Sequence, residues 1–116
     1  MPTHLRLQDP VAVEEALGHA DLTRQDLKLL SKHFLAVLSL RAPGHSVEVR
    51  VPPYAAVQVV PGVRHTRGTP PAVIETDALT WIALATGTLT WPEAEAAGRV
   101  HASGERADLT PYLPLG

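Results

Sequence analysis

The feature that most constrains this fold is the run of residues 73–104, in which nearly every expected boundary has a residue that explains it. A short apolar run rich in β-branched residues is followed by Asp77, a favoured helix N-cap. Apolar residues then continue up to Gly87, and glycine is the favoured residue just after a helix. This pattern predicts a strand over residues 73–76 and a helix over residues 78–86.

A second helix is predicted by the sequence Thr-Trp-Pro-Glu at residues 90–93. This is a capping box, in which the Thr90 hydroxyl accepts a hydrogen bond from the Glu93 amide and the Glu93 carboxylate accepts one from the Thr90 amide. The proline falls in the first turn of the helix, where a backbone N–H has no acceptor within the helix, so its missing N–H costs no hydrogen bond. Gly98 is expected to stop the helix, and the alternation over residues 99–103 predicts a final strand.

The rest of the chain supplies helices for this unit to pack against. A proline after an acidic cap predicts a short helix over residues 11–17. Apolar residues at 3-4 spacing predict an amphipathic helix over residues 24–40, with either Asp21 or Thr23 as its N-cap. The end of the chain, Leu109 to Leu115, predicts a proline-interrupted helical turn that covers one end of the core.

Two further strands are predicted over residues 47–51 and 54–60, and the proline pair between them cannot donate to a strand ladder. Their close spacing favours an antiparallel pair. Strands and helices are therefore more segregated than alternating, which indicates the α+β class. We expect a single domain, residues 1–116, built on a mostly antiparallel twisted sheet of four to five strands with helices packed on one face. Charged residues of the strands, such as Glu48 and His101, should lie on the opposite, solvent face.

Composition argues against several classes of function. The formal net charge is -2 and the pI is near 6.3, so no positive field draws the chain to nucleic acid or to anionic membranes. The absence of cysteine excludes disulfides, thiolate metal sites and cysteine catalysis. No run approaches the ~20 apolar residues of a spanning helix, and the N-terminus lacks the apolar core of a signal peptide. We expect a cytoplasmic protein with no nucleic-acid partner and no stable membrane insertion.

Motifs for catalysis or metal binding do not stand out. The six histidines form no HxxxH pair, and no serine lies in a GxSxG elbow. Glu75 and Asp77 are close together, but a strand end followed by a helix cap explains both. An enzyme would need these two residues to converge with His65, and nothing in their spacing requires it. We therefore expect no cofactor, no metal and no enzymatic activity.

One loop has a denser set of polar groups. Two arginines, Arg64 and Arg67, stand with a histidine and two threonines before a pair of prolines. Such a loop can hold a carboxylate or phosphate through charge-assisted hydrogen bonds. The simpler interpretation is a solvated turn fixed by the prolines, and the sequence favours that interpretation without excluding the first.

The run of residues 73–104 also resembles the C-terminal half of sterol carrier proteins. The family pattern is an apolar strand ending in an acid, a helix closed by glycine, a leucine, a helix of small residues, and a Gly-Arg/Lys-Val start to a final strand. The matching segments here are VIETD (residues 73–77), WIALATG (81–87), Leu89, EAEAA (93–97) and GRVHASG (98–104). With the loop of residues 64–71, the whole chain resembles the short bacterial branch of that family.

The resemblance implies a non-enzymatic domain with an apolar tunnel between sheet and helices that takes sterols, fatty acids or acyl-CoA. The helix over residues 78–86 is apolar nearly all round, so it either lies within a core or lines such a cavity. Arg64 and Arg67 are then the candidates to meet a polar head group. The candidate apolar lining residues are Phe34, Leu38, Val49, Val57, Val59, Ile74, Trp81, Leu84 and Leu89.

The chain departs from the family in two respects that support an alternative. It lacks the long C-terminal helix that closes the tunnel in many members, and its strands are shorter. The alternative is therefore an interaction module with a filled core and no ligand, in which apolar surface or exposed sheet edges make a homodimer.

Overall fold

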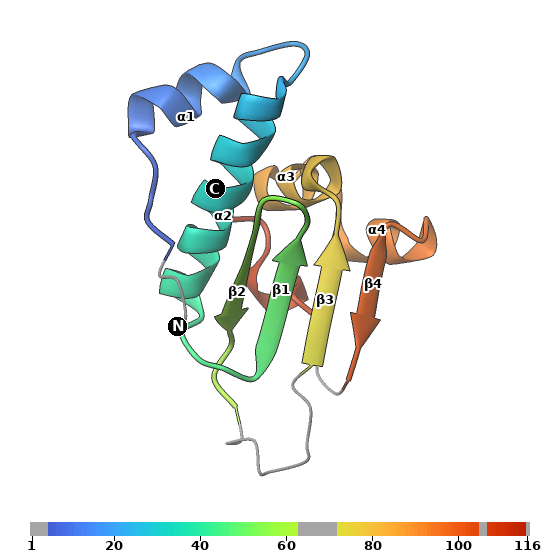
Figure 1. Ribbon diagram of the computed structural model, residues 1–116. Coiled ribbons are helices and arrows are strands. Elements are labelled where there is room, and N and C mark those ends of the chain that lie inside the picture. The colour runs from blue at the N-terminus through green and yellow to red at the C-terminus, as the bar shows by residue number, and fades with distance from the viewer. Residues whose placement is uncertain (1–4, 63–71, 105–106, 116) are drawn as a thin grey trace.

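The computed structural model describes residues 5–62, 72–104 and 107–115, and these residues form four strands, four α-helices and one turn of 3-10 helix (Figure 1). In chain order the elements are α1 (Pro10–Leu17), α2 (Arg24–Arg41), β1 (Val47–Val51), β2 (Ala55–Val59), β3 (Ala72–Thr76), α3 (Ala78–Thr86), α4 (Trp91–Ala96), β4 (Val100–Ser103) and the 3-10 turn η1 (Thr110–Tyr112).

The sheet has the strand order β2-β1-β3-β4. The pairs β1–β2 and β3–β4 are antiparallel, and the first of them is the pair that the sequence predicted. The central pair β1–β3 is parallel, with Val49 opposite Ile74, so the sheet is mixed. The α+β class and the mostly antiparallel sheet are confirmed. The β1–β3 pair is parallel because β2 ends, and β3 begins, at the end of the sheet where β1 begins: Val59 and Ala72 both lie opposite Val47.

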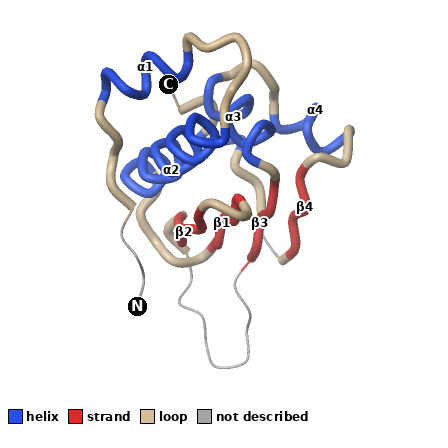
Figure 2. Tube along the Cα trace, turned by 45° about the horizontal axis from the view of Figure 1, so that its top comes forward, coloured by secondary structure: helices blue, strands red, loops and turns tan. Residues whose placement is uncertain are grey.

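Helices cover one face of this sheet, as predicted. Figure 2 shows α1, α2 and α3 on the same side of the strands. Alternate residues of β1 therefore face inward and are buried, including Val49, whereas Arg50 between them is exposed. On the outer face Arg50 forms an ion pair with Glu48 at 2.6 Å, and Glu75 lies opposite His101 in the β3–β4 register. The inward and outward faces predicted from the sequence are thus confirmed.

The predicted helix caps are also present. The main helix begins with Thr23 as its cap, and Asp26 completes the capping box. The Asp77 side chain caps α3 by accepting a hydrogen bond from the Thr80 amide. Gly87 ends α3 with a left-handed φ of 84°, which glycine adopts without steric cost. The capping box of residues 90–93 forms both of its bonds at the start of α4, which ends two residues before Gly98.

The segment before α1 is joined to α2 by a histidine. The Gln8 amide donates to Nδ1 of His33 at 3.1 Å, and the His33 ring lies edge-on to Phe34. Burial lowers the pKa of His33 below its ordinary value of 6.5. The nitrogen that accepts from Gln8 must be unprotonated, so both the hydrogen bond and the burial favour the neutral ring.

A pH dependence of stability follows from this contact. Because the folded pKa of His33 lies below the unfolded value, its contribution is present at neutral pH and is lost as the pH falls below about 6.5. We expect the loss to be about 1 kcal/mol, the typical worth of one hydrogen bond. The change His33→Gln keeps an acceptor that does not titrate, so it should flatten the unfolding free energy between pH 7 and pH 5. Urea titrations measure this, with the exposed His101→Gln as the control. Equal pH slopes in wild type and His33→Gln would contradict the assignment.

Candidate functional site

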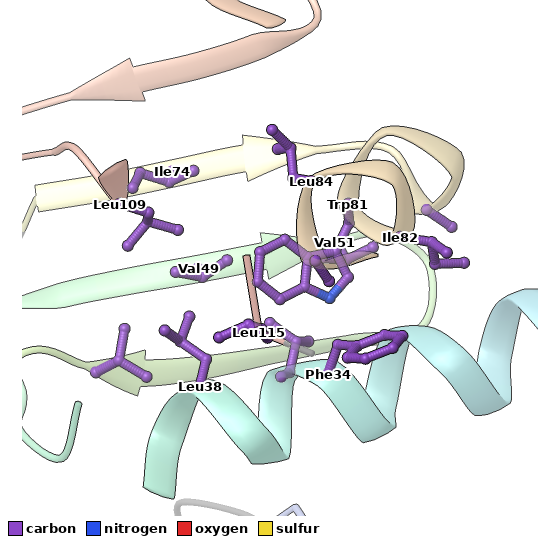
Figure 3. Packing of buried hydrophobic residues seen from close by; sticks show 14 of the residues in the cluster. Phe34, Leu38, Val49, Val51, Ile74, Trp81, Ile82, Leu84, Leu109 and Leu115 are labelled. Atoms are coloured by element: carbon purple, nitrogen blue, oxygen red, sulfur yellow. The ribbon is translucent and has the colours of Figure 1, made fainter. Parts of the chain in front are cut away.

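The structure gathers the predicted lining residues in the interior between the sheet, α2 and α3. Figure 3 shows several of these side chains converging from the strands and from both helices. Val57 and Leu89 are only partly buried and pack at the margin of the cluster. The fully or almost fully buried members are Phe34, Leu38, Val49, Val59, Ile74, Trp81 and Leu84. Their assignment as ligand contacts stays a prediction.

Two leucines from the end of the chain fill this interior. Leu109 is 0% exposed and Leu115 is 2% exposed, and both belong to the same buried cluster as Trp81 (Figure 3). The sequence predicted that Leu109 covers one end of the core, but it did not single out Leu115. Leu115 lies among prolines with no helical or strand periodicity, so no local pattern marks it as buried.

The segment that carries these leucines has little regular structure. We call residues 107–115 the C-terminal segment; its only helical part among the described residues is η1. Within the described chain, two hydrogen bonds join it to the rest of the fold. The Leu115 amide donates to the Ala85 carbonyl at 2.8 Å, and the Arg41 guanidinium donates to the exposed Pro114 carbonyl at 3.5 Å. The segment is therefore fixed mainly by apolar burial.

Trp81 is the largest side chain of α3 that faces the interior. Its side chain is 0% exposed, and its Nε1 donates to the Ser31 carbonyl of α2 at 3.3 Å. Six of the nine residues of α3 are buried, and its exposed large apolar side chain is Leu79, at 55%. The nearly all-round apolar character of this helix therefore agrees with its burial on most sides, and the narrow side that carries Leu79 faces solvent.

The interior also contains a polar atom without a partner. Among the described residues, the hydroxyl of the fully buried Ser31 has no hydrogen-bond partner. The other buried polar side chains are satisfied: Thr76 donates to the Arg99 carbonyl, and Thr80 donates to Asp77. Asp26 accepts from the Thr23 amide and contacts His19.

Two solvent-open hollows lie over β3 and β4, not between the sheet and α3. They measure about 400 and 420 Å³. Glu75 and His101 contribute to both, and Asp77 lines the first. Burial acts to raise the pKa of Asp77, but hydrogen bonds from the Thr80 hydroxyl and amide outweigh it and hold that pKa below its ordinary value. A carboxylate so engaged serves as a helix cap.

Three of the residues considered for polar chemistry, Arg64, His65 and Arg67, lie outside the described residues. Across the described ranges, no three histidine or acidic side chains gather as a metal site. Over the same ranges, no helix combines the length and the apolar character needed to span a bilayer.

The geometry defines a small α+β domain in which one sheet face and two helices enclose an apolar interior, closed by the chain's own C-terminal segment. The family model described as bacterial SCP ortholog, where SCP stands for sterol carrier protein, matches residues 23–115. The chain therefore belongs to this sterol carrier protein-like bacterial family, and the resemblance noted in the sequence is confirmed. The match begins at Thr23, the cap of α2, so α1 precedes it. No curated protein matches the chain.

Proposed function

We propose that this domain binds an apolar or amphipathic small molecule, with a fatty acyl or sterol-like body, between the sheet and the helices, and that it catalyses no reaction. Membership of the bacterial SCP ortholog family supports a domain of the lipid-binding type. The observation that carries the proposal is which side chains fill the interior. Leu109 and Leu115 occupy the space enclosed by the predicted lining residues, and they come from a segment with few hydrogen bonds to the fold.

An apolar ligand can replace these leucines at small net cost. Burial of a leucine side chain contributes about 1.5–3 kcal/mol, and each buried CH₂ of a ligand returns about 0.8 kcal/mol. A chain of several methylenes thus offsets the burial that the two leucines lose. The sheet and its hydrogen bonds need not change, because the segment is not part of the sheet.

The test is a titration of the delipidated protein with a fluorescent fatty acid, followed by quenching of the fluorescence of its two tryptophans, Trp81 and Trp91. The change Leu115→Ala weakens the occupant that competes with the ligand, so it should lower the Kd several-fold. The milder Leu115→Val should lower it less, and it keeps the test usable if the alanine variant folds poorly. Leu35→Ala is the matched control, because Leu35 is equally buried on α2 but is not a predicted lining residue. No saturable binding at micromolar probe would refute the proposal.

The filled interior also favours a second candidate, an interaction module that binds another copy of itself or another protein without a ligand. In the described sheet, β2 and β4 are the outer strands, and the outer edge of such a strand can pair with another chain. Light scattering over a range of protein concentrations tests this candidate. A mass that rises with concentration, together with a melting temperature unchanged by acyl probes, would favour it over ligand binding.

A further inference from the structure

A buried hydroxyl without a partner is unusual in a folded domain. Leaving such a group unsatisfied costs about 1–3 kcal/mol, and most buried polar atoms are paired. Ser31 is 0% exposed, and its Oγ has no partner among the described residues. Alanine would occupy the same place in α2 without that cost. The serine hydroxyl therefore needs an explanation beyond packing.

The position of Ser31 connects it to the interior. Its backbone carbonyl accepts a hydrogen bond from Trp81 Nε1, so Ser31 and the indole belong to the same contact between α2 and α3. One turn further along α3, the carbonyl of Ala85 accepts from the Leu115 amide. Four residues of α-helix span about 6 Å. A chain that takes the place of Leu115 and extends along α3 toward Trp81 therefore needs to advance only about one helical turn to reach the level of Ser31.

The surroundings restrict the chemistry of whatever reaches this hydroxyl. Apart from Ser31, the buried polar side chains of the described residues are Asp26, Thr76 and Thr80, and none of them is a cation. An ionised carboxylate or phosphate buried there would find no buried counter-charge within the described ranges, which is strongly unfavourable. An uncharged hydroxyl or carbonyl oxygen meets the need of Ser31 without introducing a charge.

We propose that Ser31 Oγ is the hydrogen-bonding partner for the inner end of the ligand, and that the ligand class is a long apolar molecule carrying one uncharged hydroxyl or carbonyl group at that end. Any charged group of the ligand lies at the other end, toward solvent. This inference rests on the proposed function, because it concerns the same interior.

Two matched probes test the inference: 1-decanol, and undecane, in which a methyl group replaces the hydroxyl. Each is delivered from cyclodextrin, and Kd is measured from the NMR signal of the Trp81 indole N–H, which donates to the Ser31 carbonyl. The ratio of the two Kd values is compared between wild type and Ser31→Ala. Comparing this ratio between the two proteins cancels the difference in hydration of the probes. We expect Ser31→Ala to reduce the preference for decanol by up to about tenfold, the worth of one hydrogen bond.

Ser39→Ala is the control variant, because the Ser39 hydroxyl on the same helix already donates to the Ala36 carbonyl. It should leave the ratio unchanged. Failure of both probes to bind wild type would overturn the proposed function itself. Binding of both with the same ratio in wild type and Ser31→Ala would overturn the inference alone. A lower melting temperature of unliganded Ser31→Ala would also overturn it, since the hydroxyl would then already be satisfied within the fold.

Discussion

Replacement of Trp81 by alanine should lower the free energy of unfolding by about 3–5 kcal/mol, the usual cost of removing a large buried aromatic side chain. The indole is fully buried, and its N–H donates to the Ser31 carbonyl, so the variant loses both apolar burial and a hydrogen bond between α2 and α3. Total stability of a domain is about 5–15 kcal/mol, so this single change removes a large share of it. Urea unfolding followed by circular dichroism measures the loss.

A control on the same helix separates burial from helix propensity. Leu79 is 55% exposed on α3, and Leu79→Ala should change the unfolding free energy by no more than about 0.5 kcal/mol. A loss from Trp81→Ala similar to that from Leu79→Ala would mean that the indole does not fill the interior. Trp81→Phe should fall between the two, because it keeps a ring but removes the hydrogen-bond donor.

The second large effect is expected at Gly44, in the loop between α2 and β1. A Cβ at this position would meet the carbonyl group of Val60 and, at 2.6 Å, the nitrogen of Pro61. Val60 has little freedom to move, because its amide donates to the Ala42 carbonyl and its own carbonyl accepts from the Ser46 amide and hydroxyl. Overpacking of this kind costs about 1–3 kcal/mol.

The backbone adds to this cost. Gly44 has φ of 153°, a conformation that residues with a side chain rarely adopt. Holding alanine in this conformation costs about 1–3 kcal/mol more. Gly98→Ala is the matched control, since Gly98 has φ of 69° but a Cβ there would meet no atom within 4 Å. We expect Gly44→Ala to lower the midpoint of urea unfolding much more than Gly98→Ala. Equal shifts would show that the contact with Val60 is relieved by a small movement.

The parts of the fold that the sequence predicted correctly are governed by local interactions. Local capping residues act within about four residues of their own position, so the sequence alone identifies them. Examples are Asp77 as a cap, Gly87 as a stop and the Thr90–Glu93 capping box. The alternation of strand residues likewise marked the inner and outer faces of β1. The choice between Asp21 and Thr23 as the cap of α2 needed the structure, because both residue types cap helices well.

Other features depend on contacts between distant residues. The parallel pairing of Val49 with Ile74 follows from the path of the chain between β1 and β3. The alternation of apolar and polar residues predicts a strand, but it does not predict whether that strand runs parallel or antiparallel to its neighbour. For the site, the apolar pattern and the family resemblance identified side chains that do meet. They did not reveal that Leu115 lies among them, because its burial depends on packing against residues far from it in the sequence.

The burial of Leu115 has a consequence for biosynthesis. The ribosome releases the chain from its N-terminus, so all four described strands, which end at Ser103, emerge before Leu109 and Leu115. A nascent chain can therefore assemble its sheet and helices around an interior that is still open. We expect residues 107–115 to close that interior, and the interval before they emerge to be the time when a chaperone or an apolar molecule meets it most easily.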